Sequence, residues 1–148
     1  MLYPIYSDEY FMQLALQEAK KAYNQGEVPI GAVVVSNNKV IGRGANSTET
    51  LTDVTAHAEI MAITAAQLAL GAKFLTDCTL YITVEPCVMC AGAIRWARLG
   101  RVVWGASEPK SGFRQFATNI LHPKTAITNG VLETECKTLM QEFFQQKR

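Results

Sequence analysis

The chain has 148 residues, of which 49% are hydrophobic and 18% charged, and its formal net charge is +1. These values are typical of one globular domain, which we take to span residues 1–148. No apolar run reaches the ~18–20 residues that cross a bilayer. Residues 1–8 lack the basic and apolar parts of a signal peptide. We therefore expect a cytoplasmic protein with no membrane partner.

Charge is distributed unevenly along the chain. Residues 1–90 carry five Lys or Arg against nine Asp or Glu, whereas residues 91–148 carry nine Lys or Arg against four Asp or Glu. A basic half permits a polyanionic partner. Charged helix faces exposed to solvent explain the same pattern equally well.

The chain begins with a predicted helix and a hairpin. Ser7 precedes two acidic residues, which is a favourable helix start, and apolar side chains then recur at helical spacing as far as Gly26. The continuous β-branched run at 28–35 predicts a buried strand. After a turn at 36–38, residues 39–45 return as the second strand of the hairpin.

The middle of the chain predicts two more helices separated by a strand. Residues 46–55 are polar and irregular, and a helix is expected from residue 55 or 56 to residue 71. Residues 78–84 form the third predicted strand, which a proline ends. Residues 87–97 form the next helix.

The last third of the chain predicts a strand at 101–105, a long loop, a short strand within 124–131 and a helix at 133–146. The length of the loop suggests a function beyond connection. Strands that alternate with helices predict an α/β domain with a covered sheet, and the antiparallel hairpin makes that sheet mixed. The helices at 55–71 and 87–97 then begin beyond strand or loop ends, where α/β proteins place their ligands.

Two short clusters carry the chemistry, His57-x-Glu59 and Pro86-Cys87-x-x-Cys90. The two cysteines are three residues apart, so on the first turn of a helix both thiols can reach one ion. The positive end of the helix dipole favours thiolate over thiol. His57 completes a set of three ligands, which leaves one coordination position open, as catalytic zinc sites do.

Glu59 can act beside such an ion without binding it, because it lies two residues after His57 and points to another side of the helix. As a carboxylate it would accept a proton from water that the metal acidifies. As a carboxylic acid it would deliver protons to a ring nitrogen and to departing ammonia. Together these groups suit hydrolytic deamination.

Each of these residues has a simpler explanation when it is taken alone. A Cys-x-x-Cys pair can be a redox pair, and His57 or Glu59 alone would be an ordinary helix or core residue. The coincidence of all four at predicted helix starts favours the metal site. Cys78 and Cys136 lack partners at ligand spacing and lie in apolar segments, so we assign them to the core, and His122 to an ordinary loop.

The segments 27–33, 55–60 and 83–93 closely resemble those of the bacterial tRNA-specific adenosine deaminases, the TadA family, and the likeness covers nearly the whole chain. His-x-Glu followed by Pro-Cys-x-x-Cys is the signature of zinc nucleobase deaminases. The resemblance implies a cytidine-deaminase-like, three-layer α/β/α fold with a five-stranded mixed sheet. It also implies a homodimer that converts the wobble adenosine of the tRNA anticodon to inosine.

The resemblance further implies roles for individual residues. His57, Cys87 and Cys90 would be the ligands of one zinc ion per subunit, and Glu59 would carry protons. Asn46 would hydrogen-bond the target nucleotide. The pocket would be completed by Val28, Pro29, Ile30 and the backbone of Ala58.

The likeness is looser toward the C-terminus, where contacts with RNA are implied. Glu108 stands where many relatives carry aspartate, so its reach differs by one methylene. In the final helix, Phe143, Phe144, Lys147 and Arg148 resemble residues that meet the anticodon loop, where aromatic rings stack on bases and cations meet phosphates. Packing of either phenylalanine in the core explains its presence equally well.

Three functions fit these observations. The first is zinc-dependent, hydrolytic deamination of adenosine to inosine at the wobble position, with the tRNA anticodon stem-loop as partner. The second is deamination of free bases or nucleosides, such as guanine or cytosine, which uses the same chemistry but needs an enclosed pocket. The third is a noncatalytic, zinc-stabilised RNA-binding module, whose effect on RNA would not depend on Glu59.

Overall fold

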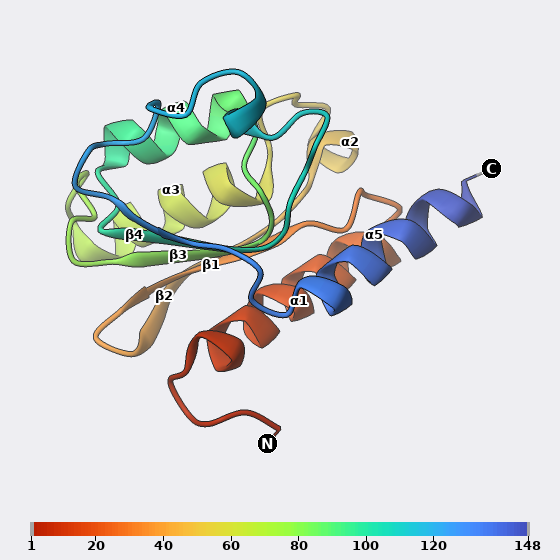
Figure 1. The fold of residues 1–148 in the computed structure, drawn as a ribbon, viewed down its shortest axis with the longest axis horizontal. Coiled ribbons are helices and arrows are strands. Elements are labelled where there is room, and N and C mark those ends of the chain that lie inside the picture. Colours follow the sequence, from red (N-terminus) through yellow and green to blue (C-terminus); the bar gives the residue numbers. More distant parts are fainter. Residues whose placement is uncertain (1, 148) are drawn as a thin grey trace.

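The computed structural model describes residues 2–147, and in it a sheet lies between two pairs of helices (Figure 1). Helices α1 (Asp8–Asn24) and α5 (Glu133–Gln146) lie against one face of the sheet. Helices α3 (Ala58–Leu70) and α4 (Val88–Ala97) cover the other face. The predicted three-layer α/β/α arrangement is confirmed.

The sheet contains five strands in the order β2-β1-β3-β4-β5. Their bounds are Gly31–Ser36 for β1, Lys39–Ala45 for β2, Thr79–Val84 for β3, Arg101–Ala106 for β4 and Ala126–Thr128 for β5. Strand β1 is antiparallel to both β2 and β3, whereas β3, β4 and β5 are mutually parallel. The sheet is therefore mixed, as the hairpin predicts.

Side chains of the central strands alternate between two cores. Leu80, Ile82 and Trp104 pack in the core beneath α3 and α4. Tyr81 and Val103 pack in the core beneath α1 and α5. Burial on both faces explains why these strands form continuous apolar runs in the sequence rather than an alternation of apolar and polar residues.

Strand β1 begins at Gly31, three residues later than the sequence predicts. The backbone before it bonds to Asn46 instead of to a neighbouring strand. The Asn46 amide nitrogen Nδ2 donates to the Val28 carbonyl (3.2 Å) and the Asn46 main-chain N–H donates to the Ile30 carbonyl (3.0 Å). Pro29 has no N–H to offer a sheet. The predicted strand start was therefore wrong.

Helix α3 also begins later than predicted, at Ala58, because the residues before it are held in a turn. The Asp53 carboxylate accepts hydrogen bonds from the main-chain N–H and hydroxyl of Thr55 (2.9 and 2.8 Å). The Ala56 carbonyl accepts from the N–H of Ser47 (3.0 Å). Two short elements in polar stretches were not predicted, helix α2 (Thr48–Leu51) and the 3-10 turn η1 (Phe113–Gln115).

The cysteines outside the Cys-x-x-Cys pair lie in the core, as predicted, because Cys78 and Cys136 are both buried. His122 lies in a loop, where its Nδ1 accepts a hydrogen bond from the Lys124 N–H (3.1 Å). Among the helices of residues 2–147, none has both the length and the apolar character that crossing a bilayer requires.

Candidate active site

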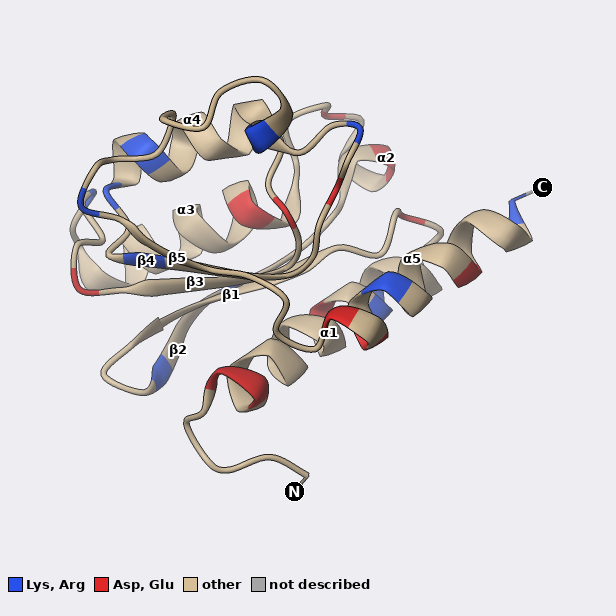
Figure 2. Ribbon diagram, in the orientation of Figure 1, with Lys and Arg blue, Asp and Glu red and all other residues tan. Residues whose placement is uncertain are grey.

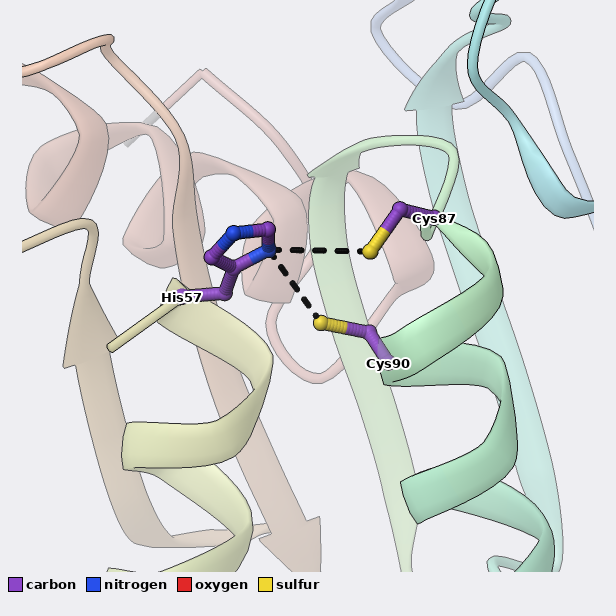
Figure 3. Close-up of side chains that lie close together, drawn as sticks. All are labelled: His57, Cys87 and Cys90. Carbon is purple, nitrogen blue, oxygen red and sulfur yellow. Dashed lines mark hydrogen bonds between the residues drawn. The ribbon is translucent and has the colours of Figure 1, made fainter. Parts of the chain in front are cut away.

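His57 and Cys87 occupy the same position in two neighbouring helices. Each directly precedes a first helical turn, His57 that of α3 and Cys87 that of α4, and neither side chain makes a capping hydrogen bond. Cys90 lies in the first turn of α4. The three side chains point toward one another between the two helix ends (Figure 3).

The spacing of these side chains fits a zinc ion. His57 Nδ1 lies 3.6 Å from Cys87 Sγ and 3.5 Å from Cys90 Sγ, and the three ligand atoms all lie within 4.8 Å of one another. Zinc bonds of ~2.05 Å to nitrogen and ~2.3 Å to sulfur, at a tetrahedral angle, separate the two ligand atoms by about 3.6 Å. In the part of the chain that the structure describes, no fourth side chain joins the group.

The electrostatics of the group favour one thiolate. The pKa of Cys87 is lowered to about 4, chiefly by a hydrogen bond from the Cys90 thiol. Burial alone would raise this pKa, but the hydrogen bond with His57 lowers it further. The pKa of Cys90 is raised, because its thiol donates to Cys87 and is buried. The hydrogen bond with Cys87 raises the pKa of His57. Thiolate is the form of cysteine that binds metal.

Glu59 is a buried carboxyl group in the first turn of α3, with 4% of the residue exposed. Burial raises its pKa to about 7, and the negative charge of Cys87 adds to this effect. Both protonation states of Glu59 are therefore accessible near neutral pH. A group of this kind can accept and return a proton in one reaction cycle.

A cavity of about 230 Å³ opens beside His57 and Glu59. Three segments meet in it, namely the extended residues before β1, the loop after β2 and the start of α3. Its lining residues are Val28, Ile30, Asn46, Thr48, His57, Ala58 and Glu59. All of these except Thr48 were predicted from the sequence. Pro29 is buried between two lining residues but does not itself line the cavity.

Asn46 lines this cavity and has one buried polar atom without a hydrogen-bond partner. It is 7% exposed, and its Nδ2 donates to the Val28 carbonyl (3.2 Å). Its side-chain oxygen Oδ1 is buried and has no hydrogen-bond partner. A buried polar atom without a partner costs free energy. A bound molecule that donates a hydrogen bond to Oδ1 would remove that cost.

Two buried carboxylates, Glu27 and Glu85, were missed from the sequence. Glu27 accepts hydrogen bonds from the N–H groups of Glu49 and Thr50 (3.1 and 2.7 Å), which fixes α2 next to the cavity. Burial alone would raise the pKa of Glu27, but the hydrogen bonds from Thr50 and Glu49 hold it below its usual range. Glu85 is also buried, and it lies two residues before Cys87. The only sequence signal for either carboxylate is that it directly adjoins an apolar strand run.

Two of the residues predicted to contact RNA, Glu108 and Phe144, line a groove of about 450 Å³ between α5 and the loop after β4. The groove is lined by Val84, Ser107, Glu108, Lys137, Met140, Gln141, Phe144 and Gln145. Phe144 is 47% exposed there. Phe143 is instead 6% exposed and packs edge-on against Tyr23 of α1, with ring centres 5.8 Å apart, which favours core packing over contact with RNA. Arg148 lies outside the described residues.

Much of the basic charge in the second half of the chain is used within the molecule. Figure 2 shows Lys and Arg spread over several elements rather than gathered on one. Arg95 donates to main-chain carbonyls of the loop before β5, and Arg98 stacks on Phe74 at 4.3 Å. Arg101 and Arg114 form ion pairs. The charge asymmetry of the sequence is therefore weak evidence for a polyanionic partner.

Comparisons with known proteins identify the family. A family model for MafB19-like deaminases matches residues 6–148. The chain is 46% identical, over 144 residues, to the tRNA-specific adenosine deaminase of Agrobacterium fabrum, and the match covers 94% of this chain and 95% of the relative. The chain belongs to the tRNA-specific adenosine deaminase family.

Solved structures support the same assignment and show what else this fold can host. A structure from work on A-to-I editing by tRNA:A34 deaminases is 45% identical with a TM-score of 0.82, and the match covers 88% of this chain and 98% of that chain. The guanine deaminase of Bacillus subtilis is 44% identical with a TM-score of 0.65, over 68% of this chain and 65% of that chain. Because a tRNA adenosine deaminase and a guanine deaminase both resemble this fold, the fold alone does not identify the substrate, which must be argued from the site.

Proposed function

We propose that this protein is a zinc-dependent hydrolytic deaminase that converts adenosine to inosine at the wobble position of tRNA. One observation carries the proposal. His57, Cys87 and Cys90 converge on a single point beside the buried carboxyl group of Glu59. They do so in a chain that shares 46% of its residues with a tRNA-specific adenosine deaminase.

The metal centre would hold one zinc ion per subunit. One nitrogen and two sulfur ligands at tetrahedral spacing form a donor set that zinc prefers. When bound, zinc would acidify a water molecule and so supply the nucleophile for attack on the purine. The position of His57 and Cys87 directly before two helices keeps both side chains fixed for this purpose.

Glu59 would move the protons of the reaction. It would accept one proton from water and pass it to the ring nitrogen beside the amino group, and would then move a second proton from the added hydroxyl group to the amino group, which leaves as ammonia. The products are inosine and ammonia, so one water is consumed in each turnover. The buried Asn46 Oδ1 would accept a hydrogen bond from the nucleotide. Val28 and Ile30 would pack against the base, next to the backbone of Ala58.

The groove beside α5 would bind the rest of the anticodon loop. The groove lies at the C-terminal ends of β3 and β4, because it is lined by Val84, the last residue of β3, and by Ser107, which follows β4. The chain continues from this end of β3 to Cys87. We propose that Phe144 stacks on an unpaired base and that Glu108 contacts the RNA where the groove begins. Lys137 would meet a phosphate. The contact of Arg148 with RNA stays a prediction from the sequence.

A second candidate is deamination of a free base, which the 44% identity to a guanine deaminase supports. Purified protein is therefore incubated with an anticodon stem-loop that carries adenosine at the wobble position and, separately, with guanine and cytosine. We expect inosine in the RNA by mass spectrometry and no change in either base. Deamination of a free base with no inosine in RNA would contradict the proposal.

Glu59→Ala separates an enzyme from a noncatalytic RNA-binding module. The variant should keep its zinc, because Glu59 is not one of the three converging ligands. It should lose turnover, because no other group of the cavity lining can carry the proton. An undiminished effect of this variant on RNA would favour the binding module.

We also propose that the protein is a homodimer. The outer face of α3 and α4 holds a hollow of about 380 Å³ that Phe74 and Trp96 line, and Trp96 is 80% exposed. Apolar surface of this kind indicates an interaction site, and we propose that a second copy of the chain covers it. Light scattering should give twice the chain mass for the wild type and the chain mass for Trp96→Glu. A tRNA substrate also leads us to propose a cytoplasmic location.

A further inference from the structure

Glu85 is a buried carboxylate two residues before the candidate ligand Cys87, with 6% of the residue exposed. Its two oxygens accept four hydrogen bonds from the loop after β4. Two come from the main-chain N–H groups of Glu108 and Arg114, both at 3.2 Å. Two come from Nε and Nη2 of the Arg114 guanidinium, at 3.2 and 3.1 Å. A buried charge is tolerated when it is paired and hydrogen-bonded in this way.

The same loop is also fastened to the segment that carries Cys87. Gly112 forms an isolated antiparallel bridge with Cys87, and the Phe113 N–H donates to the Pro86 carbonyl at 2.8 Å. Glu108 begins the turn, because its carbonyl accepts from the Gly112 N–H at 2.9 Å. The loop therefore wraps around one carboxylate and forms the wall beside the candidate metal ligands.

Arg114 is held from three directions. Besides its bond to Glu85, Nη2 donates to the Ser107 hydroxyl at 3.2 Å. The guanidinium carbon lies 4.9 Å above the ring centre of Trp104. The Arg114 side chain is 40% exposed, whereas that of Glu85 is 3% exposed. A planar guanidinium can pair with a carboxylate through two hydrogen bonds and stack on an aromatic ring at once, which a lysine cannot do.

We propose that Arg114 is a positioning residue, which holds the loop after β4 on Glu85 and thereby fixes Glu108 and the adjoining groove for RNA. This inference rests on the proposed function, since it concerns affinity for RNA. Exposed ion pairs contribute little, but removal of Arg114 would leave a buried carboxylate without its charged partner and release the loop. Glu59 and Cys90 would stay in place, because they lie in α3 and α4 and neither helix contributes to this pair. Cys87 contacts the loop through Gly112, so the zinc content of the variant reports whether Cys87 keeps its position.

Arg101 offers a matched control at the opposite end of β4. Its guanidinium pairs through two hydrogen bonds with Asp8, at 2.8 and 2.7 Å, and also donates to the Thr128 hydroxyl at 2.9 Å. The Arg101 side chain is 32% exposed, close to the value for Arg114. This pair joins α1 to the first residue of β4. Loss of either pair should lower the melting temperature, but only loss of the Arg114 pair should weaken RNA binding.

The experiment compares Arg114→Met with Arg101→Met, and Arg114→Lys with Arg101→Lys as milder variants that keep the charge. Zinc content, melting temperature and steady-state kinetics on the anticodon stem-loop are measured for the zinc-loaded protein, well below each melting temperature. Arg114→Met should raise KM about tenfold and change kcat less than about threefold, the pattern of lost uniform binding. Arg114→Lys should give an intermediate KM. The Arg101 variants should melt lower with KM unchanged.

Limited proteolysis adds a measurement that does not depend on activity. Lys110 is exposed in the same loop, so trypsin should cleave after it faster in Arg114→Met than in Arg101→Met. An unchanged KM for Arg114→Met, or an equal rise in both Met variants, would overturn the proposal. If the wild type forms no inosine, the proposed function fails instead, and equal cleavage in the two variants would then overturn the positioning of the loop.

Discussion

Helix α1 and the pair α3 and α4 differ in how they begin. The residue before α1 is Ser7, whose hydroxyl accepts a hydrogen bond from the Tyr10 N–H at 3.1 Å and so caps the helix. The residues before α3 and α4 are His57 and Cys87, and neither caps its helix through a side chain. Their side chains turn toward one another instead. Helix α1 uses this position for a stabilising cap, whereas α3 and α4 place two of the three candidate metal ligands there.

This difference shows what allows a functional residue to replace a structural one. A missing cap costs a helix about 1 kcal/mol. Helices α3 and α4 can bear that cost because tertiary packing supports them. Ala58, Ala62 and Ala66 of α3 are buried against the sheet, and Ala91 and Ile94 of α4 are buried in the same core. The uncapped N–H groups also favour thiolate at Cys87.

Cys87→Ser, which replaces a candidate metal ligand by a helix-capping residue, should have the largest effect. Serine is a good helix cap but a poor zinc ligand, so zinc content and deaminase activity should both be lost. In the metal-free state the variant should melt no lower than metal-free wild type, because the new cap adds about 1 kcal/mol to helix stability. Metal analysis, an activity assay and calorimetry in chelator would measure this. Full activity in a zinc-free preparation of the variant would refute the metal centre.

The two layers also approach the sheet closely over glycine, which gives a matched pair of substitutions. A Cβ atom at Gly44 would overlap the carbonyl oxygen of Ala58 at the start of α3. A Cβ atom at Gly31 would overlap main-chain atoms of Ala15 and Ala19 in α1. Each Gly→Ala change should therefore lower the free energy of unfolding by roughly 1–3 kcal/mol.

The activities of the two glycine variants should differ, because Ala58 adjoins both His57 and Glu59. Gly44→Ala should lower kcat on the anticodon stem-loop, whereas Gly31→Ala should leave it unchanged at a temperature where both variants are folded. Denaturant unfolding gives the stability and steady-state kinetics the rates. Equal kcat values in the two variants would mean that the start of α3 is not a sensitive part of the site.

Spacing within one element predicted much of the fold and the pairing of two candidate metal ligands. Helix α5 has the predicted bounds, and the three-residue spacing brings Cys87 and Cys90 to one side at the start of α4, where His57 from the start of α3 joins them. Contacts between segments far apart in the chain could not be predicted from the sequence. Nothing in a linear sequence pairs Glu85 with Arg114, which lies 29 positions later in the short 3-10 turn η1. The late start of α3 has the same cause, because side-chain contacts in the preceding loop decide it.

Phe143 and Phe144 show a finer limit. Successive residues of a helix point about 100° apart, so one of two adjacent aromatic residues faces α1 while the other faces solvent. The sequence does hold a signal, because Cys136 and Phe143 are seven residues apart and both are buried on one side of α5. That stripe selects Phe143 for the core and Phe144 for the groove.

The smallest effect in the comparison is expected at the capped helix. Ser7→Ala removes the acceptor for the Tyr10 N–H and should lower the free energy of unfolding by about 1 kcal/mol. For a chain of this size that corresponds to a fall in melting temperature of about 2–4 °C. Activity and zinc content should not change, because α1 lies on the face of the sheet away from the metal ligands. Ser7→Asn restores a capping acceptor and should recover most of the loss. Loss of zinc in Ser7→Ala would show that the two helix layers are coupled through the sheet. That result would contradict the expectation that the start of α1 affects stability alone.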